Sequence, residues 1–209
     1  TVLVRLVISP RLAVYLACAA TAVVANYLLG KDMMWDTLDY HLYAGFSALH
    51  DRFSQDYFAA GPQSYFNPYV YVPFYLLARS GLPALLATSI LAIIQSGVLW
   101  LTYEIAVVVA ASDSPERRIA LGVCAVALAF ANPILIAELG SSYSDVITAE
   151  LVLAGWLLLA RAVGSPGTAS IVCAGLLLGA ASALKPTNSV HALSAFVLLL
   201  FFIVKLVTR

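Results

Sequence analysis

"LAVYLACAATAVVANYLL", residues 12–29, is an almost entirely apolar run that lies between Arg11 and Lys31. The hydrocarbon core of a bilayer needs about 20 apolar residues of helix, and roughly 17–25 are tolerated. This run therefore predicts a membrane-spanning helix. It also sets the class of fold in which the rest of the chain is interpreted.

The composition of the whole chain agrees with that interpretation. Of its 209 residues, 62% are hydrophobic and 11% are charged, with a mean hydropathy of +0.94, whereas soluble domains are about 45–50% apolar and about 25% charged. The formal net charge is zero. Because there is no dense Lys/Arg run to follow a phosphate backbone, nucleic acid is excluded as a partner.

Further apolar stretches follow the first one and predict an all-α membrane protein with about six transmembrane helices. They cover residues 82–111, 119–137, 146–160, 171–184 and 190–204. The last two are short and span only if their flanks join in. We expect one transmembrane domain over residues 1–209. Since the chain opens on Thr1 and ends just past an apolar run, we expect it to be the N-terminal part of a longer protein.

The distribution of Lys and Arg in the short loops predicts the orientation, because cytoplasmic loops carry the excess. With a cytoplasmic N-terminus, seven basic residues lie inside and four outside. The inner group is Arg5, Arg11, Arg117, Arg118, Arg161, Lys205 and Arg209, and the outer group is Lys31, Arg52, Arg79 and Lys185. The same topology places most of the acids on the outer side.

The long outer loop, residues 30–81, has helical periodicity. Trp35, Leu38 and Leu42 recur at apolar spacing, while Asp36 and Tyr40 begin a polar face, which predicts an amphipathic helix in the membrane interface. Later, Asn67-Pro68 provides an N-cap followed by proline at the first helical position. The loop is therefore expected to fold as interfacial helices.

The loop begins with an acidic group. Asp32, Asp36 and Asp39 are spaced three or four residues apart, so on a helix neighbouring members share a side. Carboxylates so close repel one another, which suits them to proton transfer or to a divalent cation. The alternative is a solvated polar face. Cys18, Cys124 and Cys173 show no zinc-site spacing, and we assign no metal or cofactor.

Other charged residues flank the later apolar runs. Asp145 heads the fourth run, where an acid also simply stabilises a helix N-terminus. Lys185 ends the fifth, just before Pro186, where its ammonium would meet a phosphate or extend to the lipid headgroups. Arg52 is a further candidate phosphate contact. His41 lies next to the acids and is a candidate binding residue, although a histidine in such a position more often has a structural role.

Four motifs together resemble a known family. They are "WDTLDYHLY" (35–43), "YFNPYVYVP" (65–73), "YSDV" (143–146) and "LGAASALKPTN" (178–188). In order and topology the chain resembles the multi-spanning GT-C glycosyltransferases, particularly the bacterial members that use polyprenyl-phosphate sugars. The resemblance covers most of the chain.

The resemblance implies a location, a substrate and residue roles. The protein would lie in the inner (plasma) membrane and transfer a sugar from a polyprenyl phosphate to an acceptor on the outer, periplasmic face, with inversion. Asp36 would be the general base, with Asp39 and Asp32 as alternatives, and Asp145 would orient the acceptor or a metal. Lys185, Arg52 and His41 would bind the lipid phosphate or sugar.

Two alternatives remain open. GT-C enzymes usually have about ten or more spans, so a chain with six also fits a non-catalytic accessory subunit that packs against other membrane chains. A transporter would require Gln95, Glu104 or Glu150 to line a continuous cavity.

Overall fold

The computed structural model describes residues 9–30, 34–52, 54–56, 59, 61–164 and 167–207, and within them every regular element is helical. The expected all-α fold is confirmed for this part of the chain. Asp32, one of the candidate bases, lies outside the described residues. So do Arg5, Lys31 and Arg209 from the charge count, together with the side chain of Lys205.

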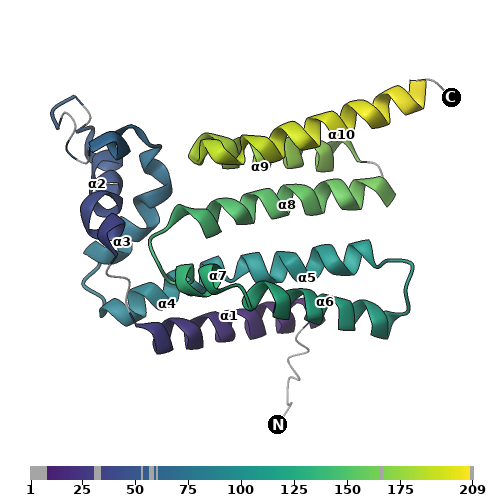
Figure 1. Ribbon diagram of the computed structural model, residues 1–209, viewed down its shortest axis with the longest axis horizontal. Coiled ribbons are helices and arrows are strands. Elements are labelled where there is room, and N and C mark those ends of the chain that lie inside the picture. The colour runs from purple at the N-terminus through teal and green to yellow at the C-terminus, as the bar shows by residue number, and fades with distance from the viewer. Residues whose placement is uncertain are drawn as a thin grey trace, which may run out of the picture.

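The long helices lie side by side and run roughly along one direction (Figure 1). They are α1 (Pro10–Leu29), α4 (Ala84–Gln95), α5 (Gly97–Val109), α6 (Pro115–Phe130), α8 (Ser144–Gly164), α9 (Thr168–Leu184) and α10 (Ser189–Val207). α4 and α5 follow one another with a single break at Ser96. The result is a helical bundle with two distinct ends.

Three apolar helical segments among the described residues are long enough to cross a membrane. They are Pro10–Leu29, Ala84–Val109 and Ser144–Val163, with 20, 26 and 20 residues. They correspond to three of the predicted runs and indicate a membrane protein. The other three runs are also helical, but their helices α6, α9 and α10 are shorter than these three segments in the part of the chain that the structure describes.

The third predicted run is interrupted as its sequence suggests. α6 ends at Phe130, and a short helix, α7 (Pro133–Glu138), begins after Asn132. The Asn132 Oδ1 atom accepts a hydrogen bond from the Ile134 N–H at 2.9 Å, and Pro133 takes the first helical position, where its missing N–H costs nothing.

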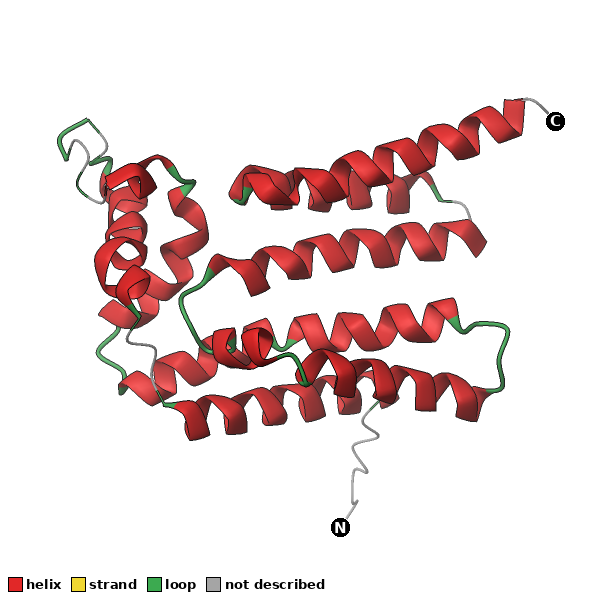
Figure 2. Cartoon of the chain, viewed as in Figure 1, coloured by secondary structure: helices red, strands yellow, loops and turns green. Residues whose placement is uncertain are grey.

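The described residues between α1 and α4 fold into a compact group of short helices, here called the end lobe, at the left of Figure 1. It contains the π-helical turn η1 (Thr37–His41), α2 (Leu42–His50), the 3₁₀ turns η2 (Gly61–Tyr65) and η3 (Pro68–Tyr71), and α3 (Val72–Arg79). A short loop, residues 80–83, connects α3 to α4 (Figure 2). The predicted helix start at Asn67-Pro68 is confirmed, since Asn67 Oδ1 accepts from the Tyr69 N–H at 3.1 Å.

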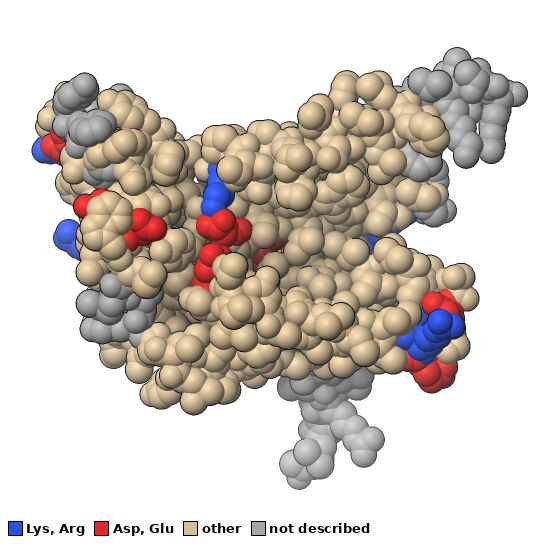
Figure 3. Space-filling view, viewed as in Figure 1, with Lys and Arg blue, Asp and Glu red and all other residues tan. Residues whose placement is uncertain are grey.

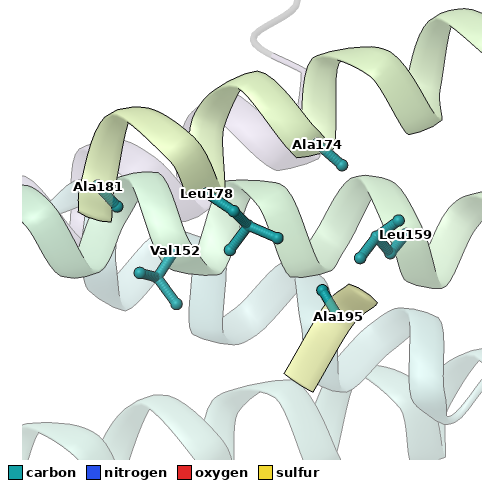
Figure 4. Packing of buried hydrophobic residues seen from close by; sticks show 6 residues of the cluster. All are labelled: Val152, Leu159, Ala174, Leu178, Ala181 and Ala195. Atoms are coloured by element: carbon teal, nitrogen blue, oxygen red, sulfur yellow. The ribbon is translucent and has the colours of Figure 1, made fainter. Parts of the chain in front are cut away.

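Small residues allow close packing on one side of the bundle. Val152, Leu159, Ala174, Leu178, Ala181 and Ala195 form a buried cluster between α8, α9 and α10 (Figure 4). A Cβ atom on Gly155 would lie 2.9 Å from Leu178 Cγ and 3.3 Å from the Ala174 carbonyl oxygen. α8 and α9 therefore approach more closely than larger side chains would allow, which is typical of membrane helix pairs.

Away from the lobe, one carboxylate joins three helices. Glu104 on α5 is buried, and its Oε2 and Oε1 atoms lie 2.5 Å from Arg161 Nη2 on α8 and 3.3 Å from Arg11 Nε on α1. The other two residues considered for a transport path also make internal contacts. Gln95 binds the loop that follows α7, and the Glu150 carboxylate packs against Gly97.

Candidate functional site

The loop from Leu139 to Tyr143, between α7 and α8, connects the bundle to the end lobe. The fully buried Gln95 side chain holds this loop at two points: its Oε1 accepts from the Gly140 N–H at 2.6 Å, and its Nε2 donates to the Ser141 carbonyl at 3.0 Å. Gly140 has a φ of +85°, and a Cβ there would collide with the Asn26 amide. The site therefore rests on a loop whose backbone is closely constrained.

The next residue of the loop joins the lobe. The Ser142 Oγ atom lies 2.6 Å from His41 Nδ1 and 2.6 Å from Thr37 Oγ1, and all three side chains are buried. The His41 ring also stacks on Tyr71, with 4.5 Å between centroids and 18° between planes. His41 is only 1% exposed, so the structure places it inside the contact between lobe and bundle.

Asp36 and Asp39, which the sequence alone could not separate, have different surroundings. Asp36 is half-buried, and its Oδ2 atom accepts a hydrogen bond from the Tyr143 hydroxyl at 3.1 Å. Asp39 is exposed, and no described side chain forms an ion pair or hydrogen bond with it. The acid linked to the bundle is therefore Asp36.

Tyr40 lies beside this contact, at the centre of a group of aromatic rings. Its ring packs edge-on against Tyr71 at 5.9 Å and against Phe66 at 6.2 Å. Burial, together with the neighbouring Tyr71 hydroxyl and the negative charge of Asp36, raises the pKa of the Tyr40 phenol. Tyr40 therefore stays neutral and can donate a hydrogen bond next to Asp36.

Two residues beyond Tyr143, Asp145 forms an ion pair with Lys185. Asp145 lies in the first turn of α8 and Lys185 directly follows α9, so the pair joins two helix ends. Both side chains are partly accessible, 49% for Asp145 and 28% for Lys185. Figure 3 shows acidic and basic surface together in the hollow between the end lobe and the α8–α10 side of the bundle.

Glu138, at the end of α7, adds a further carboxyl group beside this pair. Burial and the negative charge of Asp145 raise the pKa of Glu138 to about 6, against the opposing effect of Lys185. The carboxyl group therefore changes its charge at mildly acidic pH, next to the ion pair.

Arg52 is bound elsewhere in the lobe. It makes two hydrogen bonds to Asp56, Nη2–Oδ1 at 2.6 Å and Nε–Oδ2 at 2.8 Å, and a third to Gln55. The guanidinium lowers the pKa of the Asp56 carboxyl. The structure thus links Asp36 to Tyr143 and pairs Asp145, two residues further along the chain, with Lys185, and Arg52 has no part in those contacts.

A cleft of about 650 Å³ opens between α2, η2, η3 and the end of α9. We call it the aromatic cleft, because Tyr40, Tyr43, Tyr65, Phe66 and Tyr69 contribute to its wall. Tyr40 is shared with the surroundings of Asp36, and Ala183 and Pro186 bring the cleft to the neighbourhood of Lys185. Within the described residues, no three His, Cys, Asp or Glu side chains are arranged to hold a metal ion.

The sequence interpretation did not identify Tyr143, Ser142 or the loop-binding role of Gln95. The available signal was the short polar stretch "GSSYS", residues 140–144, between two apolar runs. Polar residues at the end of a span usually contact protein or water, so this stretch could have been chosen as a candidate from the sequence.

Comparison of the chain with protein-family models, curated protein sequences and solved structures found no match. The site is therefore interpreted from its own geometry.

Proposed function

We propose that this protein is an integral membrane glycosyltransferase of the GT-C type, which moves a sugar from a polyprenyl phosphate to an acceptor at the outer surface. The observation that carries the proposal is the arrangement around the loop after α7. Tyr143 holds Asp36, and two residues later Asp145 holds Lys185. A candidate base and a candidate phosphate-binding cation thus share one support.

The proposed topology has six crossings and a cytoplasmic N-terminus. α1, the continuous α4–α5 segment, α6, α8, α9 and α10 would each cross the membrane, and α6, α9 and α10 would do so with their flanking residues. Each crossing then has one end on the side of the bundle where the end lobe lies (Figure 1). In this arrangement the lobe lies at the outer, periplasmic headgroup level of the inner membrane, where a polyprenyl donor carries its phosphate and sugar.

In the proposed reaction, Asp36 acts as the general base. A carboxylate oxygen takes the proton of the acceptor hydroxyl, the hydroxyl oxygen forms a bond to the anomeric carbon, and the bond from that carbon to the phosphate oxygen breaks. Polyprenyl phosphate leaves with the bonding electron pair, and the configuration inverts. The transition state has oxocarbenium character.

Lys185 would stabilise the negative charge that grows on the departing phosphate. Its present partner, Asp145, is half-exposed, and an exposed ion pair of this kind contributes only about 0–1 kcal/mol, so a dianionic phosphate can replace it. Asp145 would then be released to orient the acceptor. The partial accessibility of both side chains supports this exchange.

The test is transfer of labelled sugar from polyprenyl-phosphate donors by the full-length protein in membranes. Asp36→Asn removes the base and is expected to lower transfer by about 100-fold or more. Asp39→Asn is the matched control on the same turn, and it should retain nearly full activity because Asp39 is exposed. Equal transfer by both variants would rule out Asp36 as the base.

One observation favours a second function, that of a non-catalytic accessory subunit in a larger membrane complex. Asp36, Asp145 and Lys185 all have partners within the chain, as they would if their role were only to fix the lobe on the bundle. In that case no polyprenyl-phosphate sugar is consumed, and the three residues affect assembly alone. Co-purification of other membrane chains, without transfer, supports this function.

A further inference from the structure

We infer that the aromatic cleft binds a carbohydrate, and that the acceptor is therefore a glycan whose terminal sugar lies in this cleft. The assignment of the glycan as acceptor rests on the proposed function, whereas the binding of sugar rings does not. Three observations support the inference: the composition of the cleft wall, its contrast with a more apolar cavity, and its proximity to the residues around Asp36 and Lys185.

The wall of the cleft combines flat rings with hydrogen-bonding side chains. Beside the aromatic residues already named, it contains Ser47, Asp51, Gln63, Ser64 and Asn67. Sugar rings have an apolar C–H face, which packs on aromatic rings, and hydroxyl edges, which need amides, hydroxyls and carboxylates. The volume of about 650 Å³ also lies in the usual range for small-ligand sites, about 300–1,000 Å³.

A second cavity of about 280 Å³, between the lobe, α4 and the loop after α7, provides a contrast. Leu38, Leu42, Leu77, Leu82 and Leu91 contribute to its lining, which has little polar surface. A hydrocarbon ligand in this cavity would leave few protein groups without a hydrogen bond, because the lining has little polar surface. In the aromatic cleft, the same hydrocarbon would leave the Gln63 amide and the Asp51 carboxylate without hydrogen-bond partners, at a cost in free energy. The cleft therefore favours a ligand rich in hydroxyl groups.

One backbone conformation and one side-chain hydrogen bond position parts of the cleft wall. Asp51, which ends α2, has a φ of +46°, an unfavourable conformation for a residue with a side chain and one that often occurs at functional sites. Asn67 donates from Nδ2 to the Ala183 carbonyl at 2.9 Å. This bond ties the wall at η3 to the end of α9, two residues before Lys185.

The cleft also leads toward the proposed reaction centre. Tyr40 forms part of its inner wall and lies close to Asp36. A hydroxyl group of a sugar bound against Tyr40 would approach the Asp36 carboxylate, which takes its proton while the sugar oxygen bonds to the donor's anomeric carbon and polyprenyl phosphate departs.

The test measures binding of soluble methyl glycosides of glucose, galactose, mannose and arabinose to the full-length protein in nanodiscs, by saturation-transfer NMR. At least one glycoside should bind, and Tyr69→Ala should weaken its binding by about tenfold, because a ring platform is lost. Asp51→Asn should weaken it as well. The matched control is Tyr27→Ala, since Tyr27 on α1 is 66% exposed, close to the 64% of Tyr69, and does not line the cleft.

The possible results separate this inference from the proposed function. If no glycoside binds, or if Tyr69→Ala and Asp51→Asn bind as well as wild type with unchanged thermal unfolding, the cleft is not a carbohydrate site, even where transfer is observed. Equal losses in Tyr27→Ala and Tyr69→Ala would instead indicate a general role of tyrosines in the membrane interface and would overturn the inference. Glycoside binding by a wild-type protein that transfers no sugar would contradict the proposed function and leave the carbohydrate site standing.

Discussion

The two ends of the bundle each contain an ion-paired carboxylate, but in opposite environments. Glu104 is 3% exposed and bridges arginines from two other helices, whereas Asp145 is 49% exposed and pairs with a single lysine. A buried charge needs its partners continuously, because no water replaces them. An accessible pair can exchange partners, and so the same chemical groups are structural at one end and available for binding at the other.

The largest difference in stability between the two ends is expected when one acid is removed at each end. Glu104→Gln leaves Arg11 and Arg161 without their shared carboxylate. Because their side chains are 70% and 39% exposed and water can solvate them, we expect this substitution to lower the free energy of unfolding by about 1–3 kcal/mol. Asp145→Asn at the accessible end should lower it by about 1 kcal/mol or less. Thermal and denaturant unfolding in the same detergent measures both. Similar losses in the two variants would contradict the assignment of distinct roles.

The second prediction concerns the loop that supports the accessible end. Gly140→Ala adds a Cβ that collides with the Asn26 amide at a φ of +85°, and we expect a loss of about 1–3 kcal/mol in the free energy of unfolding. Gly175→Ala is the matched control, since nothing lies within 4 Å of a Cβ at this helical position and alanine is the better helix former. Equal free energies of unfolding for the two variants would show that the backbone of the loop after α7 is not constrained at Gly140.

The third prediction concerns the pH dependence of stability that Glu138 causes at the accessible end. Its pKa is raised from 4.5 to about 6 in the folded protein, so the folded state binds this proton more tightly than the unfolded state. The resulting stability is fully present below pH 4.5 and is lost as the pH rises through about 6. Because the group is only half-buried, we expect a change of about 1 kcal/mol or less.

Melting temperatures of wild type and Glu138→Gln between pH 4 and 7 provide the measurement. The wild type should lose stability relative to the variant as the pH rises, since the glutamine cannot ionise. A constant difference between the two curves would show that Glu138 has an ordinary environment.

Much of the helical framework could be predicted because it depends on local sequence. The apolar run over residues 12–29, the break at Asn132-Pro133 and the helix start at Asn67-Pro68 each act within a few residues. The number of long apolar helices could not be predicted as reliably. The runs at 171–184 and 190–204 form α9, with 17 residues, and α10, with 19, whereas each of the three candidate spans has at least 20.

Which of Asp36 and Asp39 contacts the bundle could not be predicted, for two physical reasons. The turn over Thr37–His41 is π-helical, so the angular spacing of a regular α-helix does not apply there. In addition, the deciding partner of Asp36 is Tyr143, which is 107 residues away in the sequence. Local periodicity contains no information about such a contact.

Hydropathy and capping act over one helix at a time, so the amino-acid sequence is enough to indicate an apolar, helical protein of the membrane type. The folded structure was needed to show that Gln95 fixes the loop after α7 and that this loop holds Asp36 and leads into the helix carrying Asp145. It was also needed to show that aromatic residues of the lobe surround a cleft. These features depend on helices meeting across the bundle, and their geometry is set by packing rather than by the order of residues within any one segment.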